Sequence, residues 1–313
     1  MVKMEHLETP LVGGDRPSVL KYTASYIIGT EFCERLAYYG FAGSLVLFFQ
    51  TQLDYSNEEA VNAFYLWNGA VYVTPLLGGY IADTYLGRYK TILFFAIIYL
   101  FGLALFLFGS IPGGVNGGLV FTGMYVVALG AGGIKPNCST MGADQFDLKI
   151  EQDAKEAKQF FSYFYWSINL GALLAYTIVA YICQYGLPGL GGETWGFFVG
   201  YLIPTIFLGI GIAVFMSATT KYVKHPPQGS MVSKALGIMF EAVVRRGQNT
   251  NLAHWLDVAS KVHGGSYDPN DVESVKYVTR LFPYLAVMIP YWGIYGQTKT
   301  AFQIQGCQMN SKL

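Results

Sequence analysis

Seven long apolar runs constrain the fold of this 313-residue chain more than any other feature of its sequence. A helix rises 1.5 Å per residue, so about 20 residues cross the roughly 30 Å hydrocarbon layer of a membrane. Only 13% of the residues are charged, against a norm of about 25% in soluble proteins. The sequence therefore predicts an all-α membrane protein. Its expected spans are, approximately, residues 22–50, 61–82, 91–111, 118–140, 160–184, 195–217 and 281–305.

Lysine and arginine are sorted between the two sides of these spans. The connections at about 51–60, 112–117 and 185–194 contain neither residue, whereas the segments on the other side hold sixteen of the twenty. The positive-inside rule then predicts a cytoplasmic N-terminus. Twenty acidic residues balance the twenty basic ones, so no net basic field indicates a nucleic-acid partner.

The spans also predict a domain organisation. Residues 1–21 are expected to form a cytoplasmic tail, 22–217 a six-helix transmembrane bundle, and 218–280 a cytoplasmic linker. Within the linker, Met231–Val244 carries apolar residues at near-helical spacing, as in an interfacial helix or in a helix packed on the base of the bundle. Residues 281–313 hold the seventh helix. A chain that stops there is expected to be the first part of a larger bundle whose C-terminal half is missing.

Four charged residues within the spans form a set whose charges sum to zero. Glu31, Glu34 and Arg35 share one helical face of the first span. Lys135 lies in the fourth span beside Pro136, which frees a backbone carbonyl for a polar partner. A charge at mid-membrane costs about 2.5–3.5 kcal/mol, so such residues usually face partners. The set is either a neutral structural network or an exchangeable one, in which moving a cation changes the proton affinity of a carboxylate.

A motif between the second and third spans resembles the signature of the major facilitator superfamily. Residues Gly79–Lys90 read G-Y-I-A-D-T-Y-L-G-R-Y-K. The first glycine permits close helix approach, the acid offers a counter-charge to a basic side chain, and Gly-Arg makes a tight turn with a cation at the membrane edge. The resemblance implies an inner-gate role for Gly79, Asp83, Gly87 and Arg88.

Three further motifs are together similar to the proton-coupled oligopeptide transporter family. Glu31–Gly40 reads E-F-C-E-R-L-A-Y-Y-G, Gly130–Asp147 reads G-A-G-G-I-K-P-N-C-S-T-M-G-A-D-Q-F-D, and Phe160–Gly171 reads F-F-S-Y-F-Y-W-S-I-N-L-G. The stretch Met288–Gly306 is most similar to the peptide/histidine transporter branch. The resemblance runs from about residue 20 to 310 and implies a major facilitator fold.

This resemblance also implies roles for individual residues. Glu31 and Glu34 correspond to the acidic positions of proton coupling, and Arg35 and Lys135 to the cations that engage a substrate carboxylate. A zwitterionic substrate needs such cations, together with aromatic faces for its side chains. The remaining substrate-binding positions that the resemblance implies are Tyr38, Tyr39, Tyr72, Asn169 and Trp292.

Two positions depart from the family pattern. Bacterial members carry an acid four residues after the tryptophan, where this chain has Gly296, and animal peptide transporters carry a histidine where this chain has Tyr65. Gln297 is a candidate neutral acceptor for a substrate ammonium, or it makes an ordinary interhelical hydrogen bond. Lys299 is either a pocket cation or an interface residue whose amine extends to the membrane surface.

The resemblance predicts a proton-driven symporter of di- and tripeptides or histidine that works by alternating access. Two alternatives stay open: a transporter of nitrate or another anion, and a transport-incompetent chain that binds or regulates a partner. Expected partners are the substrate, protons, the lipid bilayer and the missing C-terminal half. The plasma membrane or an endosomal, lysosomal or vacuolar membrane is the expected location. No Ser/His/Asp or metal-ligand constellation occurs in the spans, so neither an enzyme nor a cofactor nor a metal is expected.

Overall fold

The structure is a computed structural model that describes residues 17–227, 229, 231–245 and 254–297, with the single positions 302, 305, 306 and 309. Lys299 and residues 1–16 of the expected tail lie outside the described residues. Regular structure in the described part is helical, apart from one isolated bridge between Ser260 and Tyr267.

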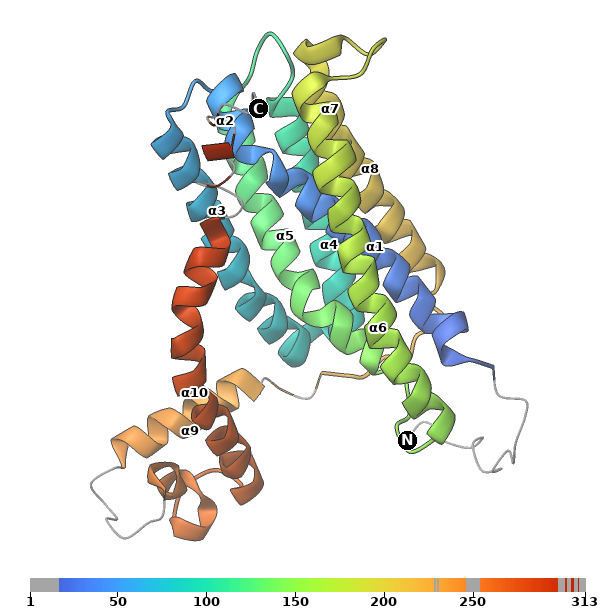
Figure 1. The fold of residues 1–313 in the computed structure, drawn as a ribbon. Helices are drawn as coiled ribbons and strands as arrows, with labels where there is room; N and C mark the ends of the chain where they lie inside the picture. Colours follow the sequence, from blue (N-terminus) through green and yellow to red (C-terminus); the bar gives the residue numbers. More distant parts are fainter. Residues whose placement is uncertain are drawn as a thin grey trace.

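The first and larger unit is a helical bundle (Figure 1). Short π-helical turns extend or interrupt three of its helices. In chain order its elements are η1 (Leu20–Ala24), α1 (Ser25–Gly43), α2 (Leu45–Gln52), α3 (Asn57–Ile81), η2 (Ala82–Leu86), α4 (Arg88–Gly109), α5 (Gly117–Ala143), α6 (Glu151–Leu174), η3 (Ala175–Val179), α7 (Ala180–Tyr185), η4 (Gly192–Trp195) and α8 (Gly196–Ser217).

Four helical stretches among the described residues are long and apolar enough to cross a membrane. They are Arg88–Gly109, Gly117–Ala143, Glu151–Tyr185 and Gly192–Ser217. The expected first and second spans are also helical, as α1–α2 and α3, but α1 carries the three charges at positions 31, 34 and 35. The helix expected at 281–305 begins earlier, at α10 (Pro269–Gly296), because the Asp268 side chain caps its first turn and a proline follows the cap.

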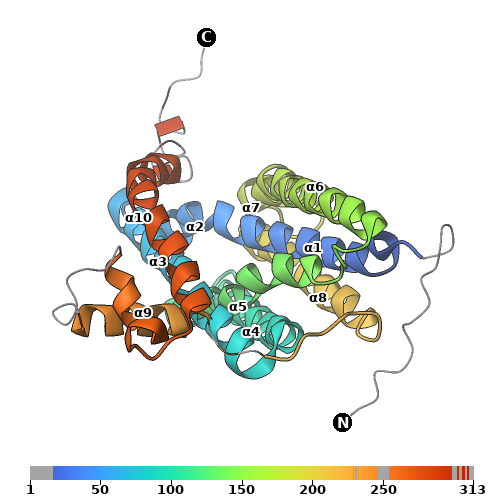
Figure 2. The same cartoon turned by 90° about the horizontal axis from the view of Figure 1, so that it is seen from below.

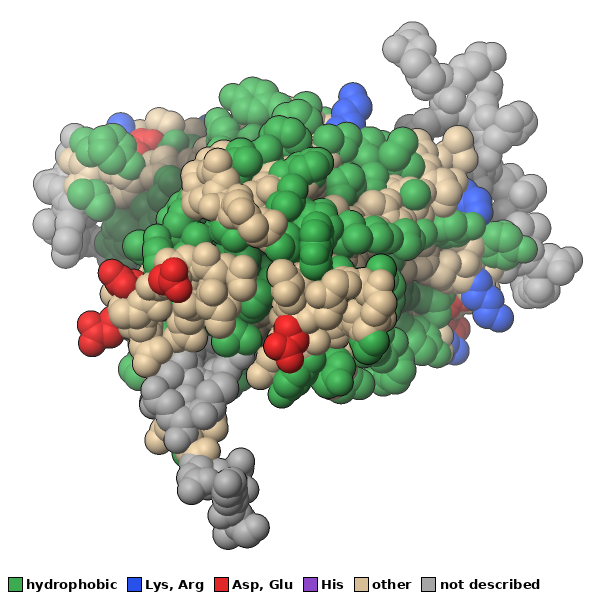
Figure 3. Space-filling view, turned by 90° about the horizontal axis from the view of Figure 1, so that it is seen from above, with side chains coloured by type: hydrophobic (Ala, Val, Ile, Leu, Met, Phe, Trp, Pro, Cys, Tyr) green, Lys and Arg blue, Asp and Glu red, His purple; other side chains and the backbone are tan. Residues whose placement is uncertain are grey.

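The bundle helices alternate in direction, which gathers the connections at two ends (Figure 1). The connections 53–56, 110–116 and 186–191, which contain no Lys or Arg, lie at the end drawn uppermost. Figure 3 looks onto that end, where acidic side chains are visible. The exposed acids there are Asp54 in a loop, Glu58 and Glu59 in the first turn of α3, and Glu193 in η4. The opposite end carries the η2–α4 turn with Arg88 and Lys90, and we call it the basic end.

Aromatic rings fill the middle of the bundle. Phe41 on α1 contacts Trp67, Phe106 and Tyr201, with ring centroids 5.5, 4.7 and 5.6 Å apart. All four side chains are fully buried or nearly so. Aromatic pairs at these distances contribute about 0.5–1.5 kcal/mol each beyond the area they bury. The rings therefore hold α1 against α3, α4 and α8.

A second, smaller apolar cluster lies beyond the basic end. It is built from α9 (Met231–Val244), η5 (Trp255–Ala259), η6 (Lys261–His263) and the first turns of α10. The helix expected over Met231–Val244 is thus present, and its buried face packs on η5 and α10. From this cluster α10 runs back beside α3 (Figures 1 and 2). The buried members of the cluster are Ile238, Ala242, Leu256, Ala259, Val272 and Val275.

One ion pair ties η5 to α10 in this small cluster. The Lys276 ammonium lies 2.5 Å from Asp257 Oδ1, and their side chains are only 13% and 16% exposed. Burial is the largest single influence on Asp257 and opposes its charge, but the hydrogen bonds from Lys276 and from the His254 amide, together with the charge of Lys276, outweigh burial and lower the pKa of the carboxyl. The hydrogen bond between Lys276 and Asp257 raises the pKa of Lys276.

We expect acid to loosen the small cluster before the bundle. The contribution of Asp257 is complete above its ordinary value of 3.8 and is lost as the pH falls through the lowered pKa. Lys276 adds stability below its ordinary value of 10.5, so it does not reverse this acid loss. Hydrogen exchange of residues 254–263 at decreasing pH, corrected for intrinsic rates, measures the effect.

Two variants make this test specific to the pair. Lys276→Gln should remove about 2 kcal/mol of local stability at neutral pH and flatten the acid response. Lys261→Gln, at an exposed position of the same cluster, should leave both unchanged. An acid response of full size in Lys276→Gln would contradict the role of the ion pair.

Candidate functional site

Three charged side chains of α1 form a buried network. Arg35 Nε lies 3.1 Å from Glu31 Oε1, and Arg35 Nη2 also pairs with Glu34 Oε2. The three residues are only 5%, 1% and 9% exposed for Glu31, Glu34 and Arg35. Glu34 Oε1 is buried with no hydrogen-bond partner among the described residues, and Glu34 borders a small apolar void. One cation thus serves two carboxylates, which leaves a net charge of −1 on α1.

Lys135 of α5 supplies the missing positive charge, and Tyr38 connects it to the network. The Lys135 ammonium lies 3.9 Å from the centre of the Tyr38 ring and 5.2 Å from the centre of the Tyr72 ring. The Arg35 guanidinium carbon lies 5.4 Å from the same Tyr38 ring. Cations are attracted to the faces of aromatic rings at such distances. Tyr38 therefore holds two cations near one another without neutralising either of them.

Glycine residues allow α5 to bring Lys135 this close to α1 and α3. A Cβ atom on Gly132 would lie 2.5 Å from Thr74 Cβ of α3, a distance that real Cβ atoms do not reach. Thr74 Oγ1 donates to the Ala128 carbonyl at 2.8 Å, and Trp67 Nε1 donates to the Met124 carbonyl at 2.8 Å. These bonds fix the register of α3 against α5 and hence the position of Lys135.

A cavity of about 340 Å³ lies between α3 and α10. Tyr72 joins it to the charged network through Lys135, and Asn68 joins it through a long hydrogen bond, 3.5 Å, from the Tyr38 hydroxyl. The two positions that depart from the family pattern meet here, because a Cβ atom on Gly296 would lie 3.9 Å from the Tyr65 ring. The lining is Phe64, Tyr65, Asn68, Tyr72, Trp292, Tyr295 and Gly296.

Other predicted substrate positions lie outside the lining of this cavity. The half-buried Tyr39 ring contacts Tyr38 and Tyr176, with centroids 5.3 and 5.7 Å apart. Asn169 is exposed on α6 and donates to the Tyr165 carbonyl of its own helix at 2.8 Å. Gln297 follows α10 as its C-terminal cap, one residue beyond the last lining residue of the cavity. The roles of Asn169 and Gln297 stay predictions.

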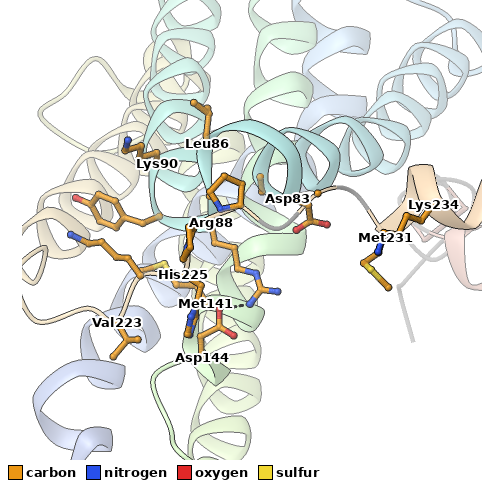
Figure 4. Close-up of a pocket in the computed structure, with 17 residues that line it drawn as sticks. Asp83, Leu86, Arg88, Lys90, Met141, Asp144, Val223, His225, Met231 and Lys234 are labelled. Atoms are coloured by element: carbon orange, nitrogen blue, oxygen red, sulfur yellow. Dashed lines mark hydrogen bonds and ion pairs between the residues drawn. The ribbon is translucent and has the colours of Figure 1, made fainter. Parts of the chain in front are cut away.

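The residues predicted to form an inner gate lie at the basic end. Gly87 has φ +74°, which a glycine adopts without strain, and it makes the tight turn into α4. Arg88 pairs with Asp144 at the end of α5 (Figure 4). The Asp83 carbonyl accepts a hydrogen bond from the Gly229 amide at 2.9 Å. Gly79 is open, since a Cβ atom there would meet nothing within 4 Å.

Sequence reasoning missed several of these residues although a signal existed for most. Asn68 precedes Tyr72 by four residues and Tyr295 follows Trp292 by three, so each shares a helical face with a predicted residue. Asp144 lies within the quoted motif Gly130–Asp147, but its pairing with Arg88 depends on how α5 ends beside α4. That pairing has no signal in the local sequence.

The arrangement is suited to binding, because it combines exchangeable charges with an aromatic cavity. Two cations that share one tyrosine ring provide a place for an anionic group. The buried carboxylates beside them are able to hold or release a proton as a cation moves. Among the described residues, no group of three His, Cys, Asp or Glu side chains is placed to hold a metal ion.

Comparisons with known proteins agree with this geometry. Residues 89–313 match the sequence profile of the POT family, PTR2. Protein NRT1/PTR FAMILY 8.5 of Arabidopsis thaliana is 34% identical over 91% of this chain and 56% of its own length. Solute carrier family 15 member 2 of Homo sapiens is 31% identical over 92% of this chain and 40% of its own length.

Solved structures give the same result for the fold. The crystal structure of an auto-inhibited POT family peptide transporter is 26% identical, with a TM-score of 0.70 over 92% of this chain and 62% of that one. The in meso crystal structure of the POT family transporter PepTSo has a TM-score of 0.73 at 24% identity and covers 96% of this chain. The chain is therefore an all-α integral membrane protein of the major facilitator fold and of a transporter class, not an enzyme.

The particular family follows from the sequence match: this chain belongs to the POT family. The predicted resemblance and fold class are thus confirmed. The chain spans about half the length of the curated relatives it matches, 56% of the plant protein and 40% of the human one.

We expect Gly132→Ala to separate α5 from α3 and displace Lys135. The added methyl would overlap Thr74, and overpacking of this kind costs about 1–3 kcal/mol. Thermal unfolding in detergent measures the loss. Gly69→Ala is the matched control on α3, because a Cβ atom there meets nothing within 4 Å and alanine favours helix. Equal stability of the two variants would contradict close packing at Gly132.

Proposed function

We propose that this chain provides the proton-binding and carboxylate-binding part of a proton-driven symporter for di- and tripeptides or histidine. The observation that carries the proposal is a neutral set of charges beside an aromatic cavity: Glu31, Glu34 and Arg35, buried on α1, and the half-buried Lys135 of α5. A structural network would need no cavity next to it. A symporter needs both the charged network and the cavity, because substrate and proton must act on the same charges.

Coupling follows from competition for Arg35. A substrate carboxylate that approaches Arg35 and Lys135 competes with Glu31 and Glu34 for the same guanidinium. The carboxylate that loses its cation, in surroundings as apolar as those of Glu34, then takes up a proton. One proton that crosses one pH unit and 100 mV releases about 3.7 kcal/mol, enough for an accumulation of about 500-fold.

The aromatic cavity supports a peptide substrate over a simple anion. Its lining contains five aromatic rings and one amide, which suit variable side chains and an ammonium group. One solved relative at 26% identity is a peptide transporter. Nitrate or another small anion is the second candidate, because Arg35 and Lys135 suffice for an anion and the lining includes no carboxylate for an ammonium. Uptake of labelled dipeptide, histidine and nitrate into proteoliposomes distinguishes them.

Glu34→Gln should abolish proton-driven accumulation in such proteoliposomes. The glutamine keeps the shape of the side chain but neither gains nor loses a proton, so the accumulation ratio should fall from up to about 500-fold toward unity. Counterflow exchange of substrate should persist, since it needs no net proton movement. Glu58→Gln, at an exposed position of α3, is the control. Driven uptake at the wild-type level would exclude Glu34 from coupling.

Lys135→Ala should impair both driven uptake and counterflow. The substitution removes one of the two cations proposed to bind the substrate carboxylate, and a charge-assisted contact contributes about 1.5–3 kcal/mol, so substrate affinity should fall by about tenfold or more. Lys155→Ala, whose side chain is 71% exposed on α6, is the matched control. Undiminished substrate binding in Lys135→Ala would reduce the lysine to a structural role.

A further inference from the structure

A large cavity lies at the basic end, away from the proposed substrate site. It measures about 820 Å³ and is enclosed by the η2–α4 turn, the end of α5 and the chain that leads into α9. Figure 4 shows Arg88 and Asp144 in contact on one side, with Met231 and Lys234 of α9 on another. Because α4 begins to span the membrane at Arg88, the cavity opens at the level of the membrane surface.

The cavity is positively charged. Two of its basic side chains are already paired, Arg88 with Asp144 and Lys234 with Asp271 at 3.2 Å. Lys224 instead lies 4.4 Å from the centre of the Tyr89 ring, and neither it nor Lys90 has a carboxylate partner within the described part of the chain. In total the lining carries four cations, Arg88, Lys90, Lys224 and Lys234, against two carboxylates, Asp83 and Asp144.

Two of these cations occupy an electrostatically unfavourable position. Arg88 and Lys90 stand in the first turn of α4, which contains no acidic residue and whose N-terminus has no side-chain cap. Cations at the start of a helix oppose its dipole. An anionic group in the cavity would relieve both this opposition and the mutual repulsion of the lysines.

The adjacent helix α9 turns an apolar face outward. Its charged residues lie on the inner side, where Lys234 pairs with Asp271 and Glu241 Oε1 accepts a hydrogen bond from the Ser266 amide at 3.1 Å. Arg245, directly after α9, donates through Nη1 to the Gly264 carbonyl at 2.5 Å. Ile238 and Ala242 complete that inner side. The opposite side bears only apolar groups and Ser233. Its exposed apolar residues are Val232, Leu236, Phe240, Val243 and Val244, between 46% and 72% exposed.

The helix that bears this apolar face starts at the cavity and lies crosswise to the bundle. Met231, the first residue of α9, lines the cavity. Figure 1 shows α9 running across the direction of the bundle helices at the basic end, with the η5 segment on its side away from the bundle. A helix in this orientation, with one apolar side, is typical of one that lies in the membrane interface.

We propose that the basic cavity and the outer face of α9 together bind an anionic phospholipid of the adjoining leaflet. The phosphate headgroup occupies the cavity among Lys90, Lys224 and Arg88, and the acyl chains follow Phe240 and its apolar neighbours. A phosphate group is a stronger acceptor for such cations than a neutral headgroup. Phospholipid always surrounds an integral membrane chain. The basic cavity accounts for the headgroup, and the apolar face of α9 accounts for the acyl chains.

The test is a titration of the chain in nonionic detergent with short-chain phosphatidylserine. Hydrogen exchange of residues 223–245 reports binding, and phosphatidylcholine of the same chain length and inorganic phosphate are titrated separately. We expect saturable protection by phosphatidylserine, with weaker protection by the other two. Equal protection by phosphatidylcholine would overturn the charge requirement. Equal protection by inorganic phosphate would overturn the assignment of the ligand as a lipid.

Variants separate the two halves of the site. Lys90→Gln with Lys224→Gln should weaken phosphatidylserine binding by about 30-fold, or about fivefold for each lysine. The double control Lys155→Gln with Lys158→Gln, on exposed α6 positions, should bind as the parent does. Phe240→Ser should weaken phosphatidylserine but not inorganic phosphate. Unchanged phosphatidylserine affinity in the double variant Lys90→Gln with Lys224→Gln would overturn the proposal. A loss of protection in Phe240→Ser without any lipid would also overturn it, because it would indicate that protein covers α9.

Discussion

The buried pairing of Arg35 with Glu31 and Glu34 is the interaction on which the rest of the structure depends. A helix that carries three charges through a low-dielectric layer is stable only if they are compensated. Within α1 the compensation is incomplete, since one guanidinium serves two carboxylates. The bundle must therefore bring a second cation from another helix. Lys135 of α5 meets that need, with its ammonium 3.9 Å from the centre of the Tyr38 ring.

The need to place Lys135 near the charges of α1 explains why α5 packs so closely against α3 and α4. Besides Gly132 against α3, Gly130 of α5 lies so near Tyr99 of α4 that a Cβ atom would sit 2.5 Å from its Cα. Asn137 donates to the carbonyls of Gly133 and Gly78 at 2.8 and 3.4 Å, on either side of the helix contact. Small residues on the membrane helices thus serve electrostatics as much as packing.

Much of this could be predicted from the sequence, because the signals are local. The helices, the charged face of α1 and the isolated Lys135 follow from apolar length and helical spacing alone. The partner of Arg88 could not be predicted. Asp83 lies in the same motif as Arg88 and Asp144 lies in another, and only the packing of α5 beside α4 selects Asp144. The outward direction of the apolar face of α9 could not be predicted either. Its spacing indicates an amphipathic helix, but which side turns inward depends on Asp271 and Gly264, far along the chain.

The cavity beside α10 gives a physical meaning to two residues that looked like separate departures. Gly296 replaces an expected acid on one helix and Tyr65 an expected histidine on another, and in space they are neighbours across one gap. A long side chain at position 296 would extend toward the Tyr65 ring, so a smaller residue there accompanies a larger one on α3. With glycine and tyrosine at these positions, the described cavity wall contains no carboxylate or imidazole and is largely aromatic. Charge in this part of the chain is thereby concentrated in the α1 and α5 network, and under the proposed function the four residues there combine electrostatic recognition with proton affinity.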